Sequence, residues 1–328
     1  MQLSKGNQEN MASNGNLPDF LCIGAEKAGT SWLDKNLRHH PDIWMPPLKE
    51  LLYFYEIAVL KDTSLKARLT SGHWIYREWR RLCKNNVRVS FAIKQSSEFM
   101  WWLKYLFGPR NDKWYVSLFR GGEGKVKGEI TPTYSRLDDK GVQHVHRLLP
   151  DAGIIFIMRN PIERAWSHAV MNLASHTGRQ LSDVSDHELY AHFNGEDSRK
   201  SGGYVATLDA WEKYYPAERM LIGFLDDIGA DPGGFLMRIF HFLGVSEDGR
   251  YIPSSVGQKV FEGRTSVIPD RFAVYLSKIY YDDLCRLEHR FGAHVSKWRE
   301  QAQTVAAKRG MVGPDHAGLS ACRQCELK

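Results

Sequence analysis

The sequence predicts an α/β fold in which a parallel β-sheet is flanked by helices. Short apolar segments alternate along the chain with amphipathic helical segments, which is typical of a parallel sheet covered on both faces. The clearest strand, Gly153–Met158, is an unbroken apolar run of the kind that is buried on both sides. A glycine turn also joins the first predicted strand to the helix that follows it.

The first predicted unit is the strand Phe20–Gly24 with the helix that follows the glycine turn. The strand is apolar and leads directly into Gly24. The helix carries Leu33 and Leu37 one turn apart, and we expect it to stop near Pro41 because proline cannot continue a helix.

The strand Gly153–Met158 runs directly into a strong helix start. Asn160 is expected as the N-cap, with Pro161 at the first helical position and Glu163 at the third, where a carboxylate completes a capping box. Apolar side chains then recur with a helical period: Ile162, Ala165, Trp166, Ala169, Val170 and Leu173.

Two further units complete the ordered core. Met220–Leu225 is predicted as a strand, followed by a helix that Asp231 caps and Gly244 ends. A long helix is expected from Pro269 to Phe291, closed by Gly292.

The composition is that of an ordinary globular protein. The 328 residues are 43% hydrophobic and 25% charged, with a formal net charge of +6. That charge is mild and scattered, so it suits a small polyanionic ligand but does not indicate nucleic acid. The first 16 residues lack the apolar core of a signal peptide, and no apolar run reaches the roughly 20 residues that span a membrane.

The five cysteines do not indicate a disulfide framework, because they are few, odd in number and mostly in apolar surroundings. We therefore expect a reducing compartment and a cytoplasmic location. Cys322 and Cys325 have no second pair to complete a zinc site, so no metal is expected.

The glycine turn Gly24–Ser31 is an arrangement that binds anions, because backbone N–H groups and the positive end of the helix dipole meet there. It is similar to a Walker A loop, but Thr30 stands where that loop has its lysine, and the available Lys27 comes before the second glycine. This change disfavours a nucleoside triphosphate and favours a donor with one 5′-phosphate. The alternative is a tight turn whose Lys27 faces solvent.

A second candidate half-site follows the strand Gly153–Met158. Arg159 comes at the carboxyl end of that strand, where open α/β sheets bind ligands, and Ser167 lies two helical turns further on. A guanidinium and a hydroxyl placed this way can hold one phosphate from two sides. Taken separately, Arg159 could form an ion pair and Ser167 could be a surface hydroxyl.

Together these two segments resemble the donor-binding signatures of sulfotransferases that use 3′-phosphoadenosine 5′-phosphosulfate (PAPS), in the branch of heparan-sulfate sulfotransferases and their bacterial relatives. The resemblance covers about residues 19–298 and includes further motifs in the same order. The motifs are Ile23–Leu33, Lys49–Phe54, Gly128–Tyr134, Ile157–Ser167, Gly203–Tyr204 with Leu208 and Trp211, and Gly263–Arg264. The resemblance implies a P-loop-like parallel sheet of the sulfotransferase fold. It also implies PAPS as donor, 3′-phosphoadenosine 5′-phosphate (PAP) as product, and no metal.

The resemblance also implies roles for individual residues. The 5′-phosphosulfate would be held by Lys27, Ala28, Gly29, Thr30, Ser31 and Trp32, and the 3′-phosphate by Arg159 and Ser167. A late loop with Gly263 and Arg264 would close over the nucleotide. Tyr204 would lie near the nucleotide, unless it is a core residue at the start of a helix.

The mechanism expected from this resemblance is in-line displacement. Lys27 would stabilise the charge that builds on the leaving phosphate, and Glu50, in a Lys-Glu motif, would take the proton of the acceptor. The alternative for Lys49 and Glu50 is an exposed charged pair, and His73 is a second candidate base. The lysine that contacts the acidic sugar in heparan-sulfate enzymes is replaced by Ile130, which speaks against a sulfated polysaccharide as acceptor.

The acceptor is expected to be a small molecule or a glycan with a hydroxyl or an amine. Lys49, Glu129, Thr131, Trp101 and Trp102 are the candidate acceptor contacts, although the aromatic cluster around the two tryptophans could equally be core. Residues 56–125 are predicted as a helical elaboration on the acceptor side of a domain covering 19–300. Residues 1–18 and 301–328 are predicted as a flexible N-terminus and a C-terminal tail.

Two other functions stay open at this point. One is a kinase-like phosphotransferase, which Thr30 at the Walker lysine position disfavours. The other is an inactive nucleotide-binding protein of the same fold. The sequence leaves the oligomeric state undetermined.

Overall fold

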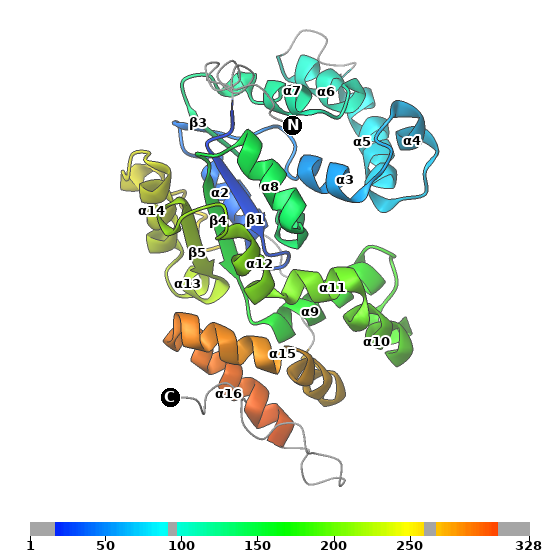
Figure 1. The fold of residues 1–328 in the computed structure, drawn as a ribbon, viewed down its shortest axis with the longest axis vertical. Helices are drawn as coiled ribbons and strands as arrows, with labels where there is room; N and C mark the ends of the chain where they lie inside the picture. Colours follow the sequence, from blue (N-terminus) through cyan, green and yellow to red (C-terminus); the bar gives the residue numbers. More distant parts are fainter. Residues whose placement is uncertain (1–16, 91–96, 259–266, 308–328) are drawn as a thin grey trace, which may run out of the picture.

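The computed structural model describes residues 17–90, 97–258 and 267–307. Its centre is one parallel sheet in the strand order β2-β3-β1-β4-β5 (Figure 1). The strands are β1 Phe20–Gly24, β2 Ile43–Trp44, β3 Val126–Ile130, β4 Gly153–Met158 and β5 Met220–Phe224. The predicted α/β fold with a parallel sheet is confirmed.

The two central strands are those that the sequence predicts most clearly. β1 and β4 have the predicted bounds, and from Phe20 to Ile23 and from Ile154 to Met158 every side chain is fully buried. An apolar residue at every position is stable only where both faces of the strand are covered. β5 is one residue shorter than predicted, because Leu225 already begins the next helix.

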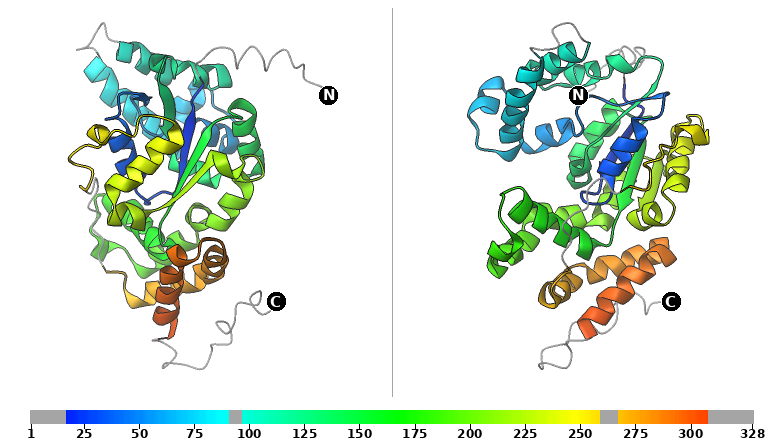
Figure 2. Two further views of the ribbon diagram at one scale, coloured as in Figure 1. Left: turned by 90° about the vertical axis from the view of Figure 1, so that its left-hand side faces the viewer. Right: turned by 180° about the vertical axis from the view of Figure 1, so that it is seen from behind.

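Helices cover both faces of the sheet. Figure 1 shows α8 (Asp139–Leu148) and α12 (Tyr204–Trp211) in front of it, and Figure 2 shows α2 (Thr30–Leu37) and α14 (Pro232–Leu243) on the opposite face. The α14 helix has the expected ends: the Asp231 side chain accepts from the backbone N–H of Gly234, and Gly244 adopts the left-handed conformation that ends many helices.

The helix α9 (Pro161–Val170) follows β4 and begins as predicted at Asn160, whose side chain accepts a hydrogen bond from the backbone N–H of Ile162. The expected capping role of Glu163 is wrong. Its carboxylate instead pairs with Arg159 at 2.9 Å, because a guanidinium is a stronger donor than a backbone N–H.

Residues 53–117 form a layer of helices beside the sheet, apart from the segment that the structure does not describe. The helices are α3 Tyr53–Val59, α4 Leu65–Thr70, α5 Trp74–Ser90, α6 Ser97–Phe107 and α7 Asp112–Ser117. Aromatic rings form the core of this layer, for example Tyr53 stacked on Tyr115 with centroids 5.0 Å apart. Within the stretch 56–125, the described residues thus form helices joined by short loops.

Four helices lie at the other end of the molecule from this layer (Figure 1). They are α10 Asp186–Asn194, α11 Glu196–Gly202, α15 Asp270–Phe291 and α16 Ala293–Ala307. The predicted boundary at residue 300 falls inside α16, because Val295, Trp298 and Ala302 bury one side of a helix that is otherwise polar. None of the described helices is long and apolar enough to span a membrane.

Candidate active site

The turn between β1 and α2 lies at the carboxyl edge of the sheet and has an unusual backbone. Lys27 has φ 68° although it is not glycine, and Gly29, the residue before α2, has φ 91°. A Cβ on Gly29 would lie 3.1 Å from side-chain atoms of Leu225 and Ile228, so these would have to shift, and φ 91° itself favours glycine. The backbone of the turn is therefore fixed by its neighbours.

Lys27 is a cation without a carboxylate partner within salt-bridge distance among the described residues. Its Nζ lies 3.6 Å from the Sδ of Met171, which is a weak acceptor. Burial lowers the pKa of Lys27, and the positive charges of Arg159 and Lys49 lower it further. Three cations therefore converge on this turn, which favours an anionic ligand.

Arg159 leaves the end of β4 and reaches the same turn. Its Nη1 donates to the carbonyl oxygen of Lys27 at 3.4 Å, and its backbone carbonyl accepts from the hydroxyl of the fully buried Tyr204 at 2.9 Å. The ion pair with Glu163 that the sequence left open is present, but the Glu163 side chain is 48% exposed. A solvent-exposed pair of this kind is worth less than about 1 kcal/mol and can yield to a phosphate.

The other predicted donor residues are placed as follows. Ser167 lies on α9 two turns beyond Arg159 and is buried. The indole of Trp32 is buried, and its Nε1 donates to the carbonyl of Val256 at 2.7 Å. Gly263 and Arg264 lie outside the described residues.

A chain of polar contacts joins this turn to the predicted base. Lys49 Nζ lies 3.3 Å from Ser31 Oγ and 2.7 Å from Glu50 Oε1. The Glu50 side chain is 38% exposed. Ser31, Lys49 and Glu50 thus lie together at the end of the turn that carries Lys27.

The backbone around Glu50 is also held in a rare conformation. Glu50 and Leu52 have φ values of 68° and 62°, which non-glycine residues adopt only where the surroundings impose them. The N–H of Glu50 donates to the carbonyl of Ile130, and the N–H of Leu51 donates to a carboxylate oxygen of Glu129. The predicted base is therefore carried by a turn that β3 anchors.

Glu129 is the centre of that anchor and does not reach the surface. It is 1% exposed, and its carboxylate accepts from the hydroxyls of Tyr115 (2.6 Å), Tyr134 (3.0 Å) and Thr131 (2.7 Å). Burial raises the pKa of this carboxyl group, although the three hydroxyls and the Leu51 N–H oppose that rise. The prediction that Glu129 and Thr131 contact the acceptor is wrong, because both side chains are buried and hydrogen-bonded inside the protein.

The aromatic cluster around Trp101 is packed in the helical layer. Trp101 is 7% exposed, donates from Nε1 to the carbonyl of Leu118, and stacks on Tyr105 at 5.4 Å. The Nε1 of Trp102 donates to Glu98. These contacts favour the core interpretation of Trp101, and they leave Trp102 at the edge of the layer.

One group of residues beside the turn was missed from the sequence. Glu26, directly before Lys27, lies 3.3 Å from Arg136 and 3.1 Å from His168. The available signal was an acidic residue inside a turn that otherwise favours anions. Its partners are distant in the sequence and could not be identified from it.

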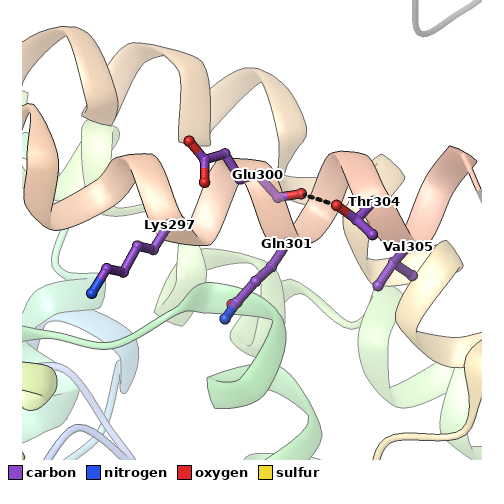
Figure 3. Close-up of a pocket in the computed structure, with 5 residues that line it drawn as sticks. All are labelled: Lys297, Glu300, Gln301, Thr304 and Val305. Atoms are coloured by element: carbon purple, nitrogen blue, oxygen red, sulfur yellow. Dashed lines mark hydrogen bonds between the residues drawn. The ribbon is translucent and has the colours of Figure 1, made fainter.

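The C-terminal helix α16 lies close to Arg159. A surface hollow of about 370 Å³ is lined by Lys297, Glu300, Gln301, Thr304 and Val305, of which Lys297 and Gln301 extend from the same side of the helix (Figure 3). Gln301 Oε1 accepts a hydrogen bond from the side chain of Asn160, the residue after Arg159. This contact fixes α16 against the start of α9.

Among the described residues, no group of three or more His, Cys, Asp or Glu side chains is arranged to hold a metal ion.

Comparison with known proteins places these features in one family. Residues 18–249 match the Sulfotransferase family. The human heparan sulfate glucosamine 3-O-sulfotransferase 6 is 30% identical over 137 residues, and the mouse protein of that name is 29% identical over the same length. The match covers 40% of this chain and 39% of either relative, so the chain spans well under half the length of these curated relatives.

Solved structures show the same fold. A sulfotransferase from Alicyclobacillus acidocaldarius superposes with a TM-score of 0.61 at 24% identity, covering 86% of this chain and 99% of that one. The sulfotransferase domain of the Synechococcus PCC 7002 olefin synthase gives a TM-score of 0.50 at 18% identity, covering 91% of this chain and 96% of that domain. Because the family match covers more than half of the sequence and includes both the Lys27 turn and Arg159, this chain belongs to the sulfotransferase family.

Proposed function

We propose that this protein moves a sulfuryl group from PAPS to a hydroxyl or amine of a small-molecule or glycan acceptor. The observation that carries the proposal is the convergence of Lys27, Lys49 and Arg159 at the carboxyl edge of the sheet, where burial, and then the charges of Arg159 and Lys49, lower the pKa of Lys27. Lys49 and Arg159 have carboxylate partners in Glu50 and Glu163. Lys27 has none within salt-bridge distance among the described residues, so the turn keeps a positive charge that favours an anionic ligand.

The residues present fit PAPS better than a nucleoside triphosphate. Lys27 precedes the second glycine of the turn and Thr30 follows it, so there is no lysine at the position that reaches β and γ phosphates in kinases. Arg159, joined to the turn through the Lys27 carbonyl, supplies a second cationic point for a donor that carries phosphates at both ends. PAPS would supply the activated sulfuryl group.

The chain itself would supply position and charge. In this proposal Lys27 and the N–H groups of the turn stabilise the negative charge that develops on the leaving 5′-phosphate. Arg159 and Ser167 hold the 3′-phosphate, and Tyr204 keeps Arg159 in place through its backbone carbonyl. Fixing both ends of the donor converts the displacement into an oriented, effectively intramolecular step.

Glu50 would take the proton from the acceptor as it attacks. Its side chain is 38% exposed, and the 2.7 Å contact with Lys49 holds one carboxylate oxygen. Lys49 also contacts Ser31, so the base is oriented relative to the donor turn. A base positioned in this way contributes about 10²–10⁴-fold to a rate.

The acceptor class stays broad in this proposal. The curated relatives are named for heparan sulfate glucosamine, but they match this chain over 137 residues only. Ile130 is buried in the core, with 1% of its surface exposed, and it carries no charge that could contact an acidic sugar. Cys22 and Cys83 form no disulfide among the described residues, which suits a reducing compartment, and we propose the cytoplasm.

Isothermal titration calorimetry with PAP tests the proposal without knowledge of the acceptor. We expect micromolar or tighter binding of PAP, and binding of ATP with magnesium that is at least about 100-fold weaker. Preference for ATP would instead support the kinase-like alternative. Tight binding of PAP combined with no release of PAP from labelled PAPS, across a wide panel of hydroxyl and amine acceptors, would support the inactive nucleotide-binding alternative.

A further inference from the structure

The acidic residue of the donor turn has its own set of buried partners. Glu26 comes directly before Lys27, and its side chain is 18% exposed. The Nη2 of Arg136 donates to Oε1 at 3.3 Å, and the Nε2 of His168 lies 3.1 Å from Oε2. Arg136 comes from the short 3-10 helix Pro132–Arg136 after β3, and His168 comes from α9. One carboxylate therefore ties the turn to two other elements.

Both partners are themselves held in place. The Arg136 side chain is 4% exposed, lies over the ring of Tyr55 at 4.9 Å and pairs with Asp197 at 3.3 Å. The Nδ1 of His168 lies 3.2 Å from the Nε2 of His192. Because neither partner can move without breaking further contacts, Glu26 is anchored to a rigid frame.

The charge on Glu26 is stable in this frame. Burial on its own disfavours the carboxylate, but the His168 ring at 3.1 Å and the positive charge of Arg136 outweigh it and lower the pKa of Glu26 to about 2. Burial and the positive charges of His168 and Arg164 lower the pKa of His192 to about 4, so that ring is neutral near pH 7. Glu26 is thus the anionic centre of a largely buried cluster.

Lys27, the next residue, needs an external restraint. Its left-handed backbone is unfavourable for a residue with a Cβ and persists only where the surroundings hold it. On its amino side the restraint is the Glu26 carboxylate, and on its carbonyl side it is the hydrogen bond from Arg159. The two contacts hold the backbone of Lys27 from both ends.

We infer that Glu26 is a positioning residue that fixes the backbone of Lys27 and so sets its ammonium group against the leaving phosphate of the donor. The inference rests on the proposed function, since it assumes that Lys27 contacts the 5′-phosphate. It differs from a purely structural ion pair, which would stabilise the whole fold and affect all ligand contacts alike.

The affinities for two nucleotides distinguish a positioning role of Glu26 from a purely structural one. PAP carries both phosphates, whereas adenosine 3′-monophosphate lacks the 5′-phosphate that Lys27 is proposed to hold. Calorimetry is run with each nucleotide on wild-type protein, Glu26→Gln and the control Glu123→Gln, an exposed glutamate in a loop. We expect Glu26→Gln to weaken PAP binding about 10-fold or more, because a charge-assisted contact is disturbed, and to change 3′-monophosphate binding less than about 2-fold. The control should match the wild-type protein for both.

A double-mutant cycle tests whether Glu26 acts through Lys27. If it does, Lys27→Met removes the contact that Glu26 positions, and adding Glu26→Gln should weaken PAP binding by no more than about 2-fold further. Glu26→Asp keeps the charge with one methylene fewer, so its loss of PAP affinity should be smaller than that of Glu26→Gln. If Glu26→Gln fails to fold in thermal denaturation, Glu26→Asp is measured in its place, and its loss should again be confined to PAP.

Three results would overturn the inference. Equal weakening of both nucleotides, or an additive double mutant, would show that Glu26 only stabilises the fold. Unchanged PAP affinity in Glu26→Gln would show that it does not position Lys27. A fourth result, no binding of either nucleotide by the wild-type protein, would overturn the proposed function instead. It is distinct from these three because no variant is needed to see it.

Discussion

Replacing Glu129 by alanine should destabilise the protein and disable the turn that carries Glu50. The substitution removes the acceptor of three buried hydroxyls, those of Tyr115, Thr131 and Tyr134, and of the Leu51 N–H. At about 1 kcal/mol for each donor left unpaired, the loss is about 4 kcal/mol. Part of it is regained because a desolvated carboxylate is also removed, so we expect a net loss of about 3 kcal/mol.

Urea denaturation, followed by fluorescence, measures this loss as a fall in the free energy of unfolding. The exposed Glu123→Ala is the matched control and should stay within about 0.5 kcal/mol of the wild-type value. Turnover of Glu129→Ala should also fall, because the Leu51 N–H no longer anchors the backbone beside Glu50. A destabilisation below about 1 kcal/mol with normal turnover would refute the role of Glu129 as an anchor.

The pH dependence gives a second reading of the same residue. Burial raises the pKa of the Glu129 carboxyl group above its value in the unfolded chain. At pH values between these two pKa values, the group is therefore protonated in the folded chain and ionised in the unfolded chain. The free energy of unfolding of the wild-type protein, relative to Glu129→Gln, should therefore rise as the pH falls through the raised pKa. An opposite slope would mean that the hydrogen bonds, and not burial, dominate at this site.

Three further predictions follow from the same contacts. Glu50→Gln should lower the turnover of labelled PAPS by about 10²–10⁴-fold and leave PAP affinity within about 2-fold in calorimetry; retention of most activity would contradict its role as base. Arg159→Ala should weaken PAP binding by about 10–100-fold, whereas Glu163→Gln, which frees the guanidinium, should not weaken it; equal effects would remove Arg159 from the 3′-phosphate site. Because the pKa of His192 is lowered in the folded chain, this ring is protonated in the unfolded chain first as the pH falls. The free energy of unfolding should therefore drop between about pH 6.5 and about pH 4. In urea titrations His192→Gln should reduce that drop, and an unchanged drop would assign it to other groups.

The parts of the fold that the sequence predicted are those with a local cause. β1 and β4 were predictable because every residue is apolar, which only a strand covered on both faces allows. The Asp231 cap and the Gly244 end of α14 depend on neighbouring residues alone. The two-residue strand β2 was not predictable, because its residues Ile43 and Trp44 become a strand only by pairing with β3.

The candidate site shows the same division. Lys27 and Arg159 could be brought together from the sequence, since parallel strands place their carboxyl ends on one edge. Glu50 depended on the resemblance and not on any local pattern. Glu26 was missed because its contact with Arg136 joins residues 110 positions apart, and the sequence holds no signal for such a pair.

The central claim is that the Lys27 turn and Arg159 hold the two ends of PAPS, and a crystal structure with bound PAP tests it most directly. The measurement is the position of the two phosphates relative to Lys27 and Arg159. We predict the 5′-phosphate within hydrogen-bonding distance of Lys27 Nζ and the N–H groups of the turn, and the 3′-phosphate on the Arg159 guanidinium. A 5′-phosphate bound elsewhere, or a 3′-phosphate that leaves Arg159 paired only with Glu163, would contradict it.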